Sequence, residues 1–134
     1  SPNKLNPNDA YLAYYPGDDY VDILGMDIYD FNNAEDYVKS VTNDLAIVKK
    51  VATEKNKLFA FTETGLESLQ TEKWFTKVLY PAIENSGICW VLTWRNYDTK
   101  HHYMPYNGQL NEADFIEFEK LPKTLFLKDI NSLN

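Results

Sequence analysis

The sequence is poor in the residues that disulfide frameworks and metal centres require. It contains one cysteine, Cys89, and two histidines among 134 residues. Because a disulfide needs two thiols and a cysteine-rich metal site needs several, neither can form within one chain. Cys89 lies in the apolar run Ile88–Leu92. We therefore expect it to behave as a small buried hydrophobic residue.

Positive charge and long apolar runs are also scarce. Lysine and arginine number 13 against 20 acidic residues, so the net charge is −7. This charge disfavours binding to nucleic-acid phosphates and to anionic membranes. No apolar run approaches the ~20 residues of a membrane-spanning helix, and no signal peptide is visible. We predict neither a nucleic-acid partner nor a membrane partner.

Glycine is limited to five residues, and no glycine-rich phosphate loop follows an apolar segment. No Ser, His and Asp set has the spacing of a serine hydrolase either. Aromatic residues, in contrast, make up 15% of the chain. Such a composition suits flat ligands such as sugar rings, although a large aromatic core explains it more simply.

Three apolar segments predict strands, and three amphipathic segments between and after them predict helices. The strands are Val21–Tyr29, Leu58–Thr62 and Ile88–Trp94; the helices are about Ala34–Lys55, Glu72–Ser86 and Glu112–Lys120. Continuous apolar runs indicate burial on both faces, as in parallel sheets. Strands that alternate with helices imply right-handed crossovers. We therefore predict an α/β fold, one module of three parallel βα units spanning residues 1–134.

Local signals refine the predicted helices. Asn33 is a favourable N-cap for the first helix, and Thr71 can cap the second. Pro81 lies inside the second helix and predicts a kink or a break. Gly87 can close that helix.

Functional side chains in parallel α/β folds lie at the carboxyl ends of the strands. Five candidates stand at those ends in this sequence: Asp27, Tyr29, Glu63, Trp94 and Arg95. An acid, aromatic rings and hydrogen-bond donors gathered at one rim are the groups that glycoside cleavage needs.

Four sequence blocks resemble glycoside hydrolase family 26, the retaining β-mannanases. Tyr15–Tyr29 is similar to the region of the family's sixth strand, and Phe59–Gly65 (FAFTETG) to the strand that carries the nucleophile. Trp90–Asn96 (WVLTWRN) is similar to the last strand. His101–Pro105 and Asp114–Phe118 fit the final loop and helix. The order and spacing of the blocks match over nearly the whole chain.

The resemblance implies a role for each candidate. Glu63 would be the catalytic nucleophile, and Tyr29 would hydrogen-bond it and touch the sugar at the cleavage subsite. Trp94 would be the floor on which that sugar stacks, and Arg95 would reach the neighbouring sugar. Asp27 would not touch the sugar itself but would orient the neighbouring residues that do. The reaction implied is hydrolysis of internal β-1,4-mannosidic bonds by double displacement, with no metal and no organic cofactor.

The resemblance also implies a missing part. A retaining glycosidase needs a second carboxyl group about 5–5.5 Å from the first. In this family that group lies in a His-Glu pair, and no such pair occurs here. We therefore expect a fragment, the C-terminal part of a (β/α)8 TIM barrel, which is inactive alone. The remaining N-terminal part of the barrel, or another copy, would cover the open sheet edges.

Two alternatives remain open. Another β-glycanase on the same barrel, such as a β-1,3-xylanase or a lichenase, would share Glu63 and differ in its loops. A non-catalytic carbohydrate-binding module would keep the aromatic rim without hydrolysis. Family resemblance also implies an extracellular or periplasmic location in a bacterium.

Overall fold

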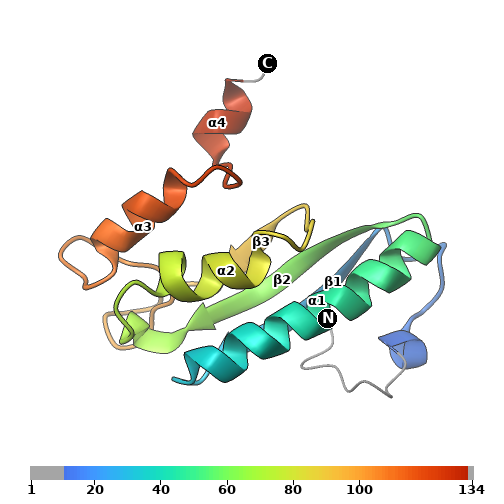
Figure 1. Cartoon of the computed structure of the whole chain (residues 1–134), viewed down its shortest axis with the longest axis horizontal. Helices are drawn as coiled ribbons and strands as arrows, with labels where there is room; N and C mark the ends of the chain where they lie inside the picture. The colour runs from blue at the N-terminus through green and yellow to red at the C-terminus, as the bar shows by residue number, and fades with distance from the viewer. Residues whose placement is uncertain (1–10, 133–134) are drawn as a thin grey trace.

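The computed structural model describes residues 11–132, and it contains one three-stranded parallel sheet. The strands are β1 (Ile23–Asp30), β2 (Leu58–Leu66) and β3 (Val91–Thr93), in the order β1-β2-β3. Figure 1 shows α1 (Ala34–Glu54) running beside β1 and β2. The predicted α/β class with three parallel strands is confirmed.

The other helical segments are short. A 3-10 helix, η1 (Tyr11–Tyr14), precedes the sheet, and η2 (Glu67–Leu69) follows β2. A π-helical turn, η3 (Phe75–Leu79), leads directly into α2 (Tyr80–Ile83). The chain then passes through β3 to α3 (Glu112–Glu119) and α4 (Leu127–Asn131). Within residues 11–132, no helix is long and apolar enough to span a bilayer.

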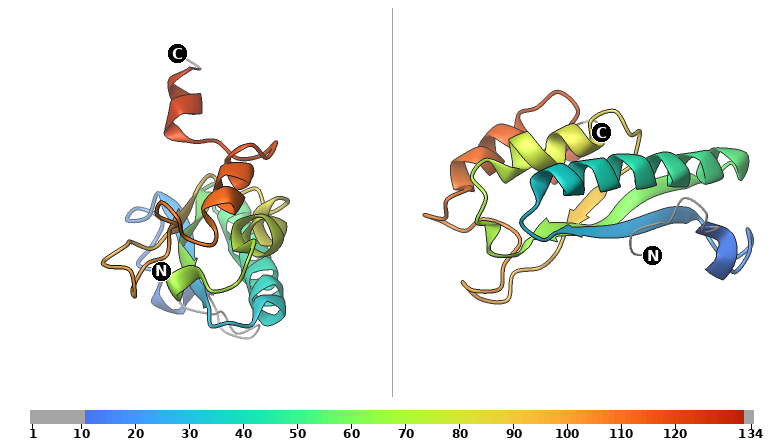
Figure 2. Two further views of the ribbon diagram at one scale, coloured as in Figure 1. Left: turned by 90° about the vertical axis from the view of Figure 1, so that its left-hand side faces the viewer. Right: turned by 60° about the horizontal axis from the view of Figure 1, so that its bottom comes forward.

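Helices cover one face of the sheet. Both views in Figure 2 place α1 and α2 on the same side of the strands. The apolar stripe predicted for α1 is confirmed, because its members are buried against β1 and β2. Each such side chain contributes about 1.5–3 kcal/mol when it leaves water. The buried residues of this layer in β1 and α1 are Leu24, Met26, Ile28, Tyr37, Val41, Leu45, Val48 and Ala52.

The N-terminus of α1 is capped as predicted. The Asn33 side chain accepts a hydrogen bond from the backbone N–H of Asp36 at 3.2 Å. The backbone N–H of Asn33 itself donates to the Asp30 carboxylate at 2.9 Å. The turn from β1 into α1 is thus fixed from both sides.

The second predicted helix differs from expectation at its start. It begins at Phe75, and Thr71 does not cap it. Asp114 of α3 accepts hydrogen bonds from the backbone N–H groups of Phe75, at 2.8 Å, and Thr76, at 3.2 Å. A residue far along the chain therefore does what a local cap does elsewhere.

The helical region is not interrupted at Pro81, where the sequence predicted a kink or a break, but its hydrogen-bond pattern changes in the turn before it. A proline ring cannot donate to the preceding turn and crowds the carbonyl there. The chain responds with a wide turn, in which the N–H of Tyr80 donates to the carbonyl of Phe75, and Pro81 then lies in the first turn of α2. α2 ends at Ile83 with Glu84 as its C-cap, so the helix ends before Gly87, which has a φ of +86°.

Strand lengths and one burial prediction need correction. β2 extends to Leu66 rather than Thr62, whereas β3 is only the three residues Val91–Thr93. Cys89 lies before β3, and its thiol is exposed rather than buried. The run around it is apolar, but in the described part of the chain no element covers it on that side. Its Sγ lies 3.1 Å from the carbonyl oxygen of Phe59.

The free edge of β1 is occupied at one residue. The Tyr11 hydroxyl donates to the carbonyl of Gly25 at 2.8 Å and accepts from its N–H at 3.0 Å. A side chain thus takes the place of a neighbouring strand at this point.

Candidate active site

Tyr29 and Glu63 meet where β1 and β2 approach their carboxyl ends. The Tyr29 hydroxyl donates a hydrogen bond to Oε2 of Glu63 at 3.0 Å. Burial first, and then this bond and the charge of Glu63, raise the pKa of Tyr29 well above its usual value. The phenol therefore stays neutral and remains a donor to the carboxylate at any physiological pH.

A β-bulge determines which way Glu63 faces. Along β1 and β2, Met26 pairs with Phe61 but Asp27 pairs with Glu63, so Thr62 is an extra residue in β2. Phe61 belongs to the core beneath the helices, and the next core-facing residue is Thr64 rather than Glu63. The bulge therefore places Thr62 and Glu63 on the face turned away from α1, which we call the open face.

Asp27 lies on the open face, two residues before Tyr29 in β1. The Thr62 Oγ1 lies 2.8 Å from Asp27 Oδ1 and 2.9 Å from the Met26 carbonyl oxygen, and its single O–H group is shared between these two acceptors. Asp27 thus contacts the residue that precedes Glu63 in the chain. The structure brings Asp27, Tyr29 and Glu63 together, as the sequence predicted.

A tyrosine from the last loop supports Tyr29. The rings of Tyr29 and Tyr103 pack edge to face with centroids 5.6 Å apart. The Tyr103 ring also lies against the backbone of Gly65, where an added Cβ would come within 2.4 Å of it. Gly65 has a φ of +153°, and its missing side chain lets this ring approach. The sequence did not predict Tyr103 as a residue of the site.

Trp94 and Arg95 follow β3 directly. The backbone N–H of Trp94 donates to the carbonyl of Thr64 at 2.9 Å, which places Trp94 beside the residue after Glu63. Arg95 is exposed, and its guanidinium lies over the ring of Tyr97 at 5.4 Å from the centroid. Trp94 therefore lies close to Glu63 along the rim. The guanidinium of Arg95 contacts the ring of Tyr97 in the same loop.

A cavity of about 530 Å³ reaches the carboxylate. Its lining includes Asp27, Tyr29 and Glu63 from the strands, together with Phe31 and Asn33 from the connection to α1. Phe31 is 85% exposed. Carboxylates, a phenol and an open aromatic ring in one hollow are groups that sugar recognition uses.

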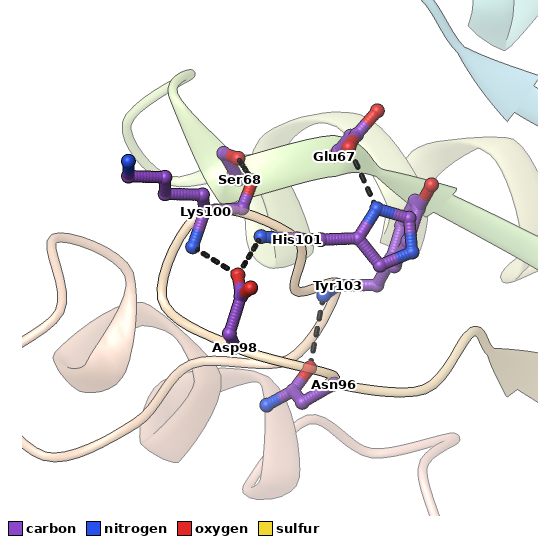
Figure 3. A network of polar contacts seen from close by, with 7 residues as sticks. All are labelled: Glu67, Ser68, Asn96, Asp98, Lys100, His101 and Tyr103. Atoms are coloured by element: carbon purple, nitrogen blue, oxygen red, sulfur yellow. Dashed lines mark hydrogen bonds and ion pairs between the residues drawn. The ribbon is translucent and has the colours of Figure 1, made fainter.

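The loops after β2 and β3 are joined by polar contacts (Figure 3). His101 Nδ1 lies 2.7 Å from the Glu67 carboxylate, and the Ser68 hydroxyl donates to the Lys100 carbonyl at 2.6 Å. Asp98 accepts from the N–H groups of Lys100 and His101, and these bonds lower its pKa. The rim that carries Glu63 is thereby tied to the loop that carries Tyr103.

Asn96 fixes the position of Tyr103. Its Oδ1 accepts from the N–H groups of Tyr103 and Met104, both at 2.9 Å, and its Nδ2 donates to the Met104 carbonyl, also at 2.9 Å.

The β-bulge at Thr62 was also not predicted, but the sequence contained one signal for it. Gly25 stands inside a buried strand, and an interior glycine often marks a bulge or a close approach.

Residues 11–132 bring together no group of three or more His, Cys, Asp or Glu side chains that could hold a metal ion. Of the two loop histidines, His101 is partly exposed and His102 is 3% exposed. The His102 ring packs edge to face with Tyr106 at 5.1 Å.

Comparison with known proteins identifies the family of this chain. A family model described as glycosyl hydrolase family 26 matches residues 1–105. The chain therefore belongs to glycosyl hydrolase family 26. A mannan endo-1,4-β-mannosidase from Bifidobacterium adolescentis is 30% identical over 98% of this chain.

Solved structures show the same relationship. A family 26 β-mannanase from Bacteroides ovatus superposes with a TM-score of 0.87 at 38% identity, covering 96% of this chain. A modular endo-β-1,4-mannanase from Cellulomonas fimi gives a TM-score of 0.82 at 35% identity over 92% of this chain. These relatives are TIM-barrel enzymes, and the three strands correspond to part of their barrel.

The chain spans only a part of each relative. It covers 15% of the Bifidobacterium protein, 38% of the Bacteroides chain and 29% of the Cellulomonas chain. In a closed barrel the open face, with Tyr29 and Glu63, would be the inner face, where side chains from several strands meet.

Proposed function

We propose that this chain supplies the nucleophile half of a retaining β-mannanase site, which cleaves internal β-1,4-mannosidic bonds. The observation that carries the proposal is the Tyr29–Glu63 hydrogen bond of 3.0 Å at the strand ends of a family 26 chain. Glu63 attacks the anomeric carbon, and Tyr29 holds the carboxylate in place. Trp94 forms the floor beneath the sugar, Arg95 reaches the next sugar, and Asp27 orients the strand end.

The reaction needs an acid that stands opposite Glu63. The Glu63 oxygen bonds to C1, the C1–O bond to the leaving sugar breaks, and a second carboxyl group protonates the departing oxygen. In the second step the same group, now a carboxylate, takes a proton from water while the water oxygen bonds to C1 and the bond between C1 and Glu63 breaks, which releases the sugar with retained configuration. We propose that the second carboxyl group lies on the strands that complete the barrel, supplied by the N-terminal part of the barrel or by another copy. The chain alone is then inactive.

The first test labels the nucleophile in the closed barrel, meaning this chain together with the strands that complete it. A 2-deoxy-2-fluoro-β-mannosyl fluoride of suitable length needs no acid, because fluoride leaves with its electron pair without a proton. We expect one covalent sugar on Glu63, found by mass spectrometry of the digested protein. Labelling at another residue would contradict the proposal.

A second test uses Glu63→Ala with azide as a small nucleophile. Removal of the nucleophile should lower kcat on mannan by about 10⁴- to 10⁶-fold. With an activated substrate, azide occupies the space of the lost carboxylate and attacks the same side of C1, so we expect an α-mannosyl azide. A β-azide would instead assign Glu63 as the acid, because azide would then replace the second nucleophile, water.

A substrate panel separates the related enzymes. We expect hydrolysis of mannan and not of β-1,3-xylan or lichenan. Sugar binding that persists in Glu63→Gln, with no hydrolysis by the closed barrel, would instead assign a binding module. We also propose an extracellular or periplasmic site of action, because a polysaccharide chain is too large to cross the cell membrane intact. Fractionation of the producing cells tests this.

A further inference from the structure

The orientation of Glu63 depends on a change of side-chain alternation within β2. Successive residues of a regular strand face opposite sides, so Phe61 and Glu63 would share a face. Phe61 is fully buried beneath the helices, and an ionised Glu63 beside it would lose its hydration without a partner. The carboxylate could not then meet Tyr29. The extra residue, Thr62, reverses the alternation and turns Glu63 to the open face.

Thr62 is tied to β1 by its own side chain. Its single O–H group is shared between the Met26 carbonyl, at 2.9 Å, and the Asp27 carboxylate, at 2.8 Å, and these are the two residues between which the pairing register shifts. The bond to the Met26 carbonyl lies at the point where the regular backbone hydrogen bonding between β1 and β2 is interrupted. Slippage of β2 back to a regular register would break both bonds.

Gly25 provides the space in which Thr62 lies. A Cβ added at Gly25 would lie 2.4 Å from Cγ2 and 2.6 Å from Oγ1 of Thr62, which is far inside van der Waals contact. The glycine backbone is also held from its other edge by the Tyr11 hydroxyl. Gly25 therefore cannot move aside easily, and a side chain there would displace Thr62.

We propose that Thr62, seated on Gly25, is a positioning residue that aims the Glu63 carboxylate at the anomeric carbon. This inference rests on the proposed function, in which Glu63 is the nucleophile. Thr62 touches no reacting atom; it acts by fixing the backbone that carries Glu63. A misplacement of about 1 Å can slow a reaction by about 10²-fold. Formation of the glycosyl-enzyme should therefore depend on Thr62, whereas sugar binding should not.

The test measures the rate of glycosyl-enzyme formation in the closed barrel. Enzyme is mixed with saturating 2-deoxy-2-fluoro-β-mannosyl fluoride, and the covalent adduct is followed by intact mass. The Glu63 oxygen bonds to C1 while the C1–F bond breaks, so the observed rate reports nucleophilic attack alone. The rate constant is fitted only to the molecules that have become labelled at the end of the reaction. A variant that is partly unfolded therefore still yields a rate for its folded molecules.

Three variants change the contact in different ways. Thr62→Val keeps the shape and removes the hydroxyl, and we expect labelling about 10- to 100-fold slower. Thr62→Ser keeps the hydroxyl and should retain most of the rate. Gly25→Ala leaves Thr62 unchanged but fills its space, and should be as slow as Thr62→Val. Thr42→Val, on the exposed surface of α1, is the matched control and should label like the parent.

Binding separates positioning from a merely structural role. The inhibition constant of a manno-oligosaccharide product should change little in Thr62→Val, while the labelling rate falls. A purely structural role would lower Tm and the labelled fraction but leave the rate per labelled molecule unchanged. A parent-like labelling rate in Thr62→Val would therefore overturn the inference, and so would a parent-like rate in Gly25→Ala.

The proposed function can fail separately. If the adduct maps to a residue other than Glu63, the nucleophile assignment is wrong and the role of Thr62 falls with it. If the adduct maps to Glu63 but Thr62→Val labels as fast as the parent, only the positioning role is wrong. If Thr62→Ser is as slow as Thr62→Val, the hydroxyl is not what positions Glu63, and the inference is again overturned.

Discussion

The Tyr29 hydroxyl donates to the Glu63 carboxylate across 3.0 Å, and this bond joins β1 to β2 through two residues that are 34 positions apart in the chain. Tyr29 is itself packed against Tyr103, which Asn96 holds by its backbone. The candidate nucleophile is thus supported from β1 and from the last loop at once.

Replacing Tyr29 by phenylalanine should slow catalysis without disturbing the fold. The ring contact with Tyr103 remains, but the carboxylate loses a donor. A hydrogen bond to a charged group contributes about 1.5–3 kcal/mol, so kcat/KM on mannan should fall roughly 10- to 100-fold. Steady-state kinetics of the closed barrel measure this. Tyr97→Phe, at an exposed position of the rim, is the control. A Tyr29→Phe enzyme with parent kinetics would show that the bond does not serve catalysis.

The stability of the chain should fall at alkaline pH because of its buried tyrosines. Burial raises the pKa of Tyr37, which is 3% exposed and bonds Thr64 Oγ1 at 2.6 Å. Below pH 10 both states keep the proton, and the full stability is present. As pH rises above 10, the unfolded state ionises first, so the free energy of unfolding falls by up to about 1.4 kcal/mol per pH unit for each such tyrosine.

Urea unfolding at pH 8 to 11.5 measures this dependence. Tyr37→Phe should be less stable at pH 8, because the Thr64 hydroxyl loses its partner, and should show a shallower alkaline decline. A decline as steep as that of the parent would mean that other groups control it.

Loss of the indole N–H of Trp74 should destabilise the junction of β1 and α1. Trp74 Nε1 donates to the buried carboxylate of Asp30 at 3.0 Å, and Asp30 is 3% exposed. Trp74→Phe removes that donor and also leaves a cavity. We expect a loss of about 3–5 kcal/mol from the cavity and from the one carboxylate oxygen that loses its donor. Chemical denaturation of the chain measures it. The double variant Trp74→Phe with Asp30→Asn tests the coupling: additive losses would show that the bond contributes nothing.

Asp114 should be the most important polar residue of α3. It accepts from two backbone N–H groups at the start of η3, so Asp114→Ala removes a cap supplied from another element. The expected cost is about 1–2 kcal/mol in the free energy of unfolding. Glu117→Ala, an exposed acid of the same helix that pairs with Lys120, should change stability by less than about 0.5 kcal/mol. Equal effects of the two variants would contradict the capping role.

Local sequence patterns determined the order of strands and helices, the cap at Asn33 and the irregular helical turn before Pro81. These features depend on neighbours in the chain: apolar spacing, a side chain that bonds the next turn, and a missing N–H group. The same patterns placed Tyr29 and Glu63 at strand ends. Because parallel strands align their carboxyl ends, the proximity of Tyr29 to Glu63 followed from the predicted topology.

The tertiary structure decided what depends on distant partners. Asp114 displaced Thr71 as the cap of the second helical region, because α3 packs against its first turn. Cys89 is exposed although its run is apolar. The face on which Glu63 lies was decided by the bulge at Thr62. In β1, Gly25 leaves space for the Thr62 side chain and Asp27 accepts a hydrogen bond from it. Strand periodicity alone would have turned Glu63 into the core, since a bulge is a property of two paired strands rather than of one sequence segment.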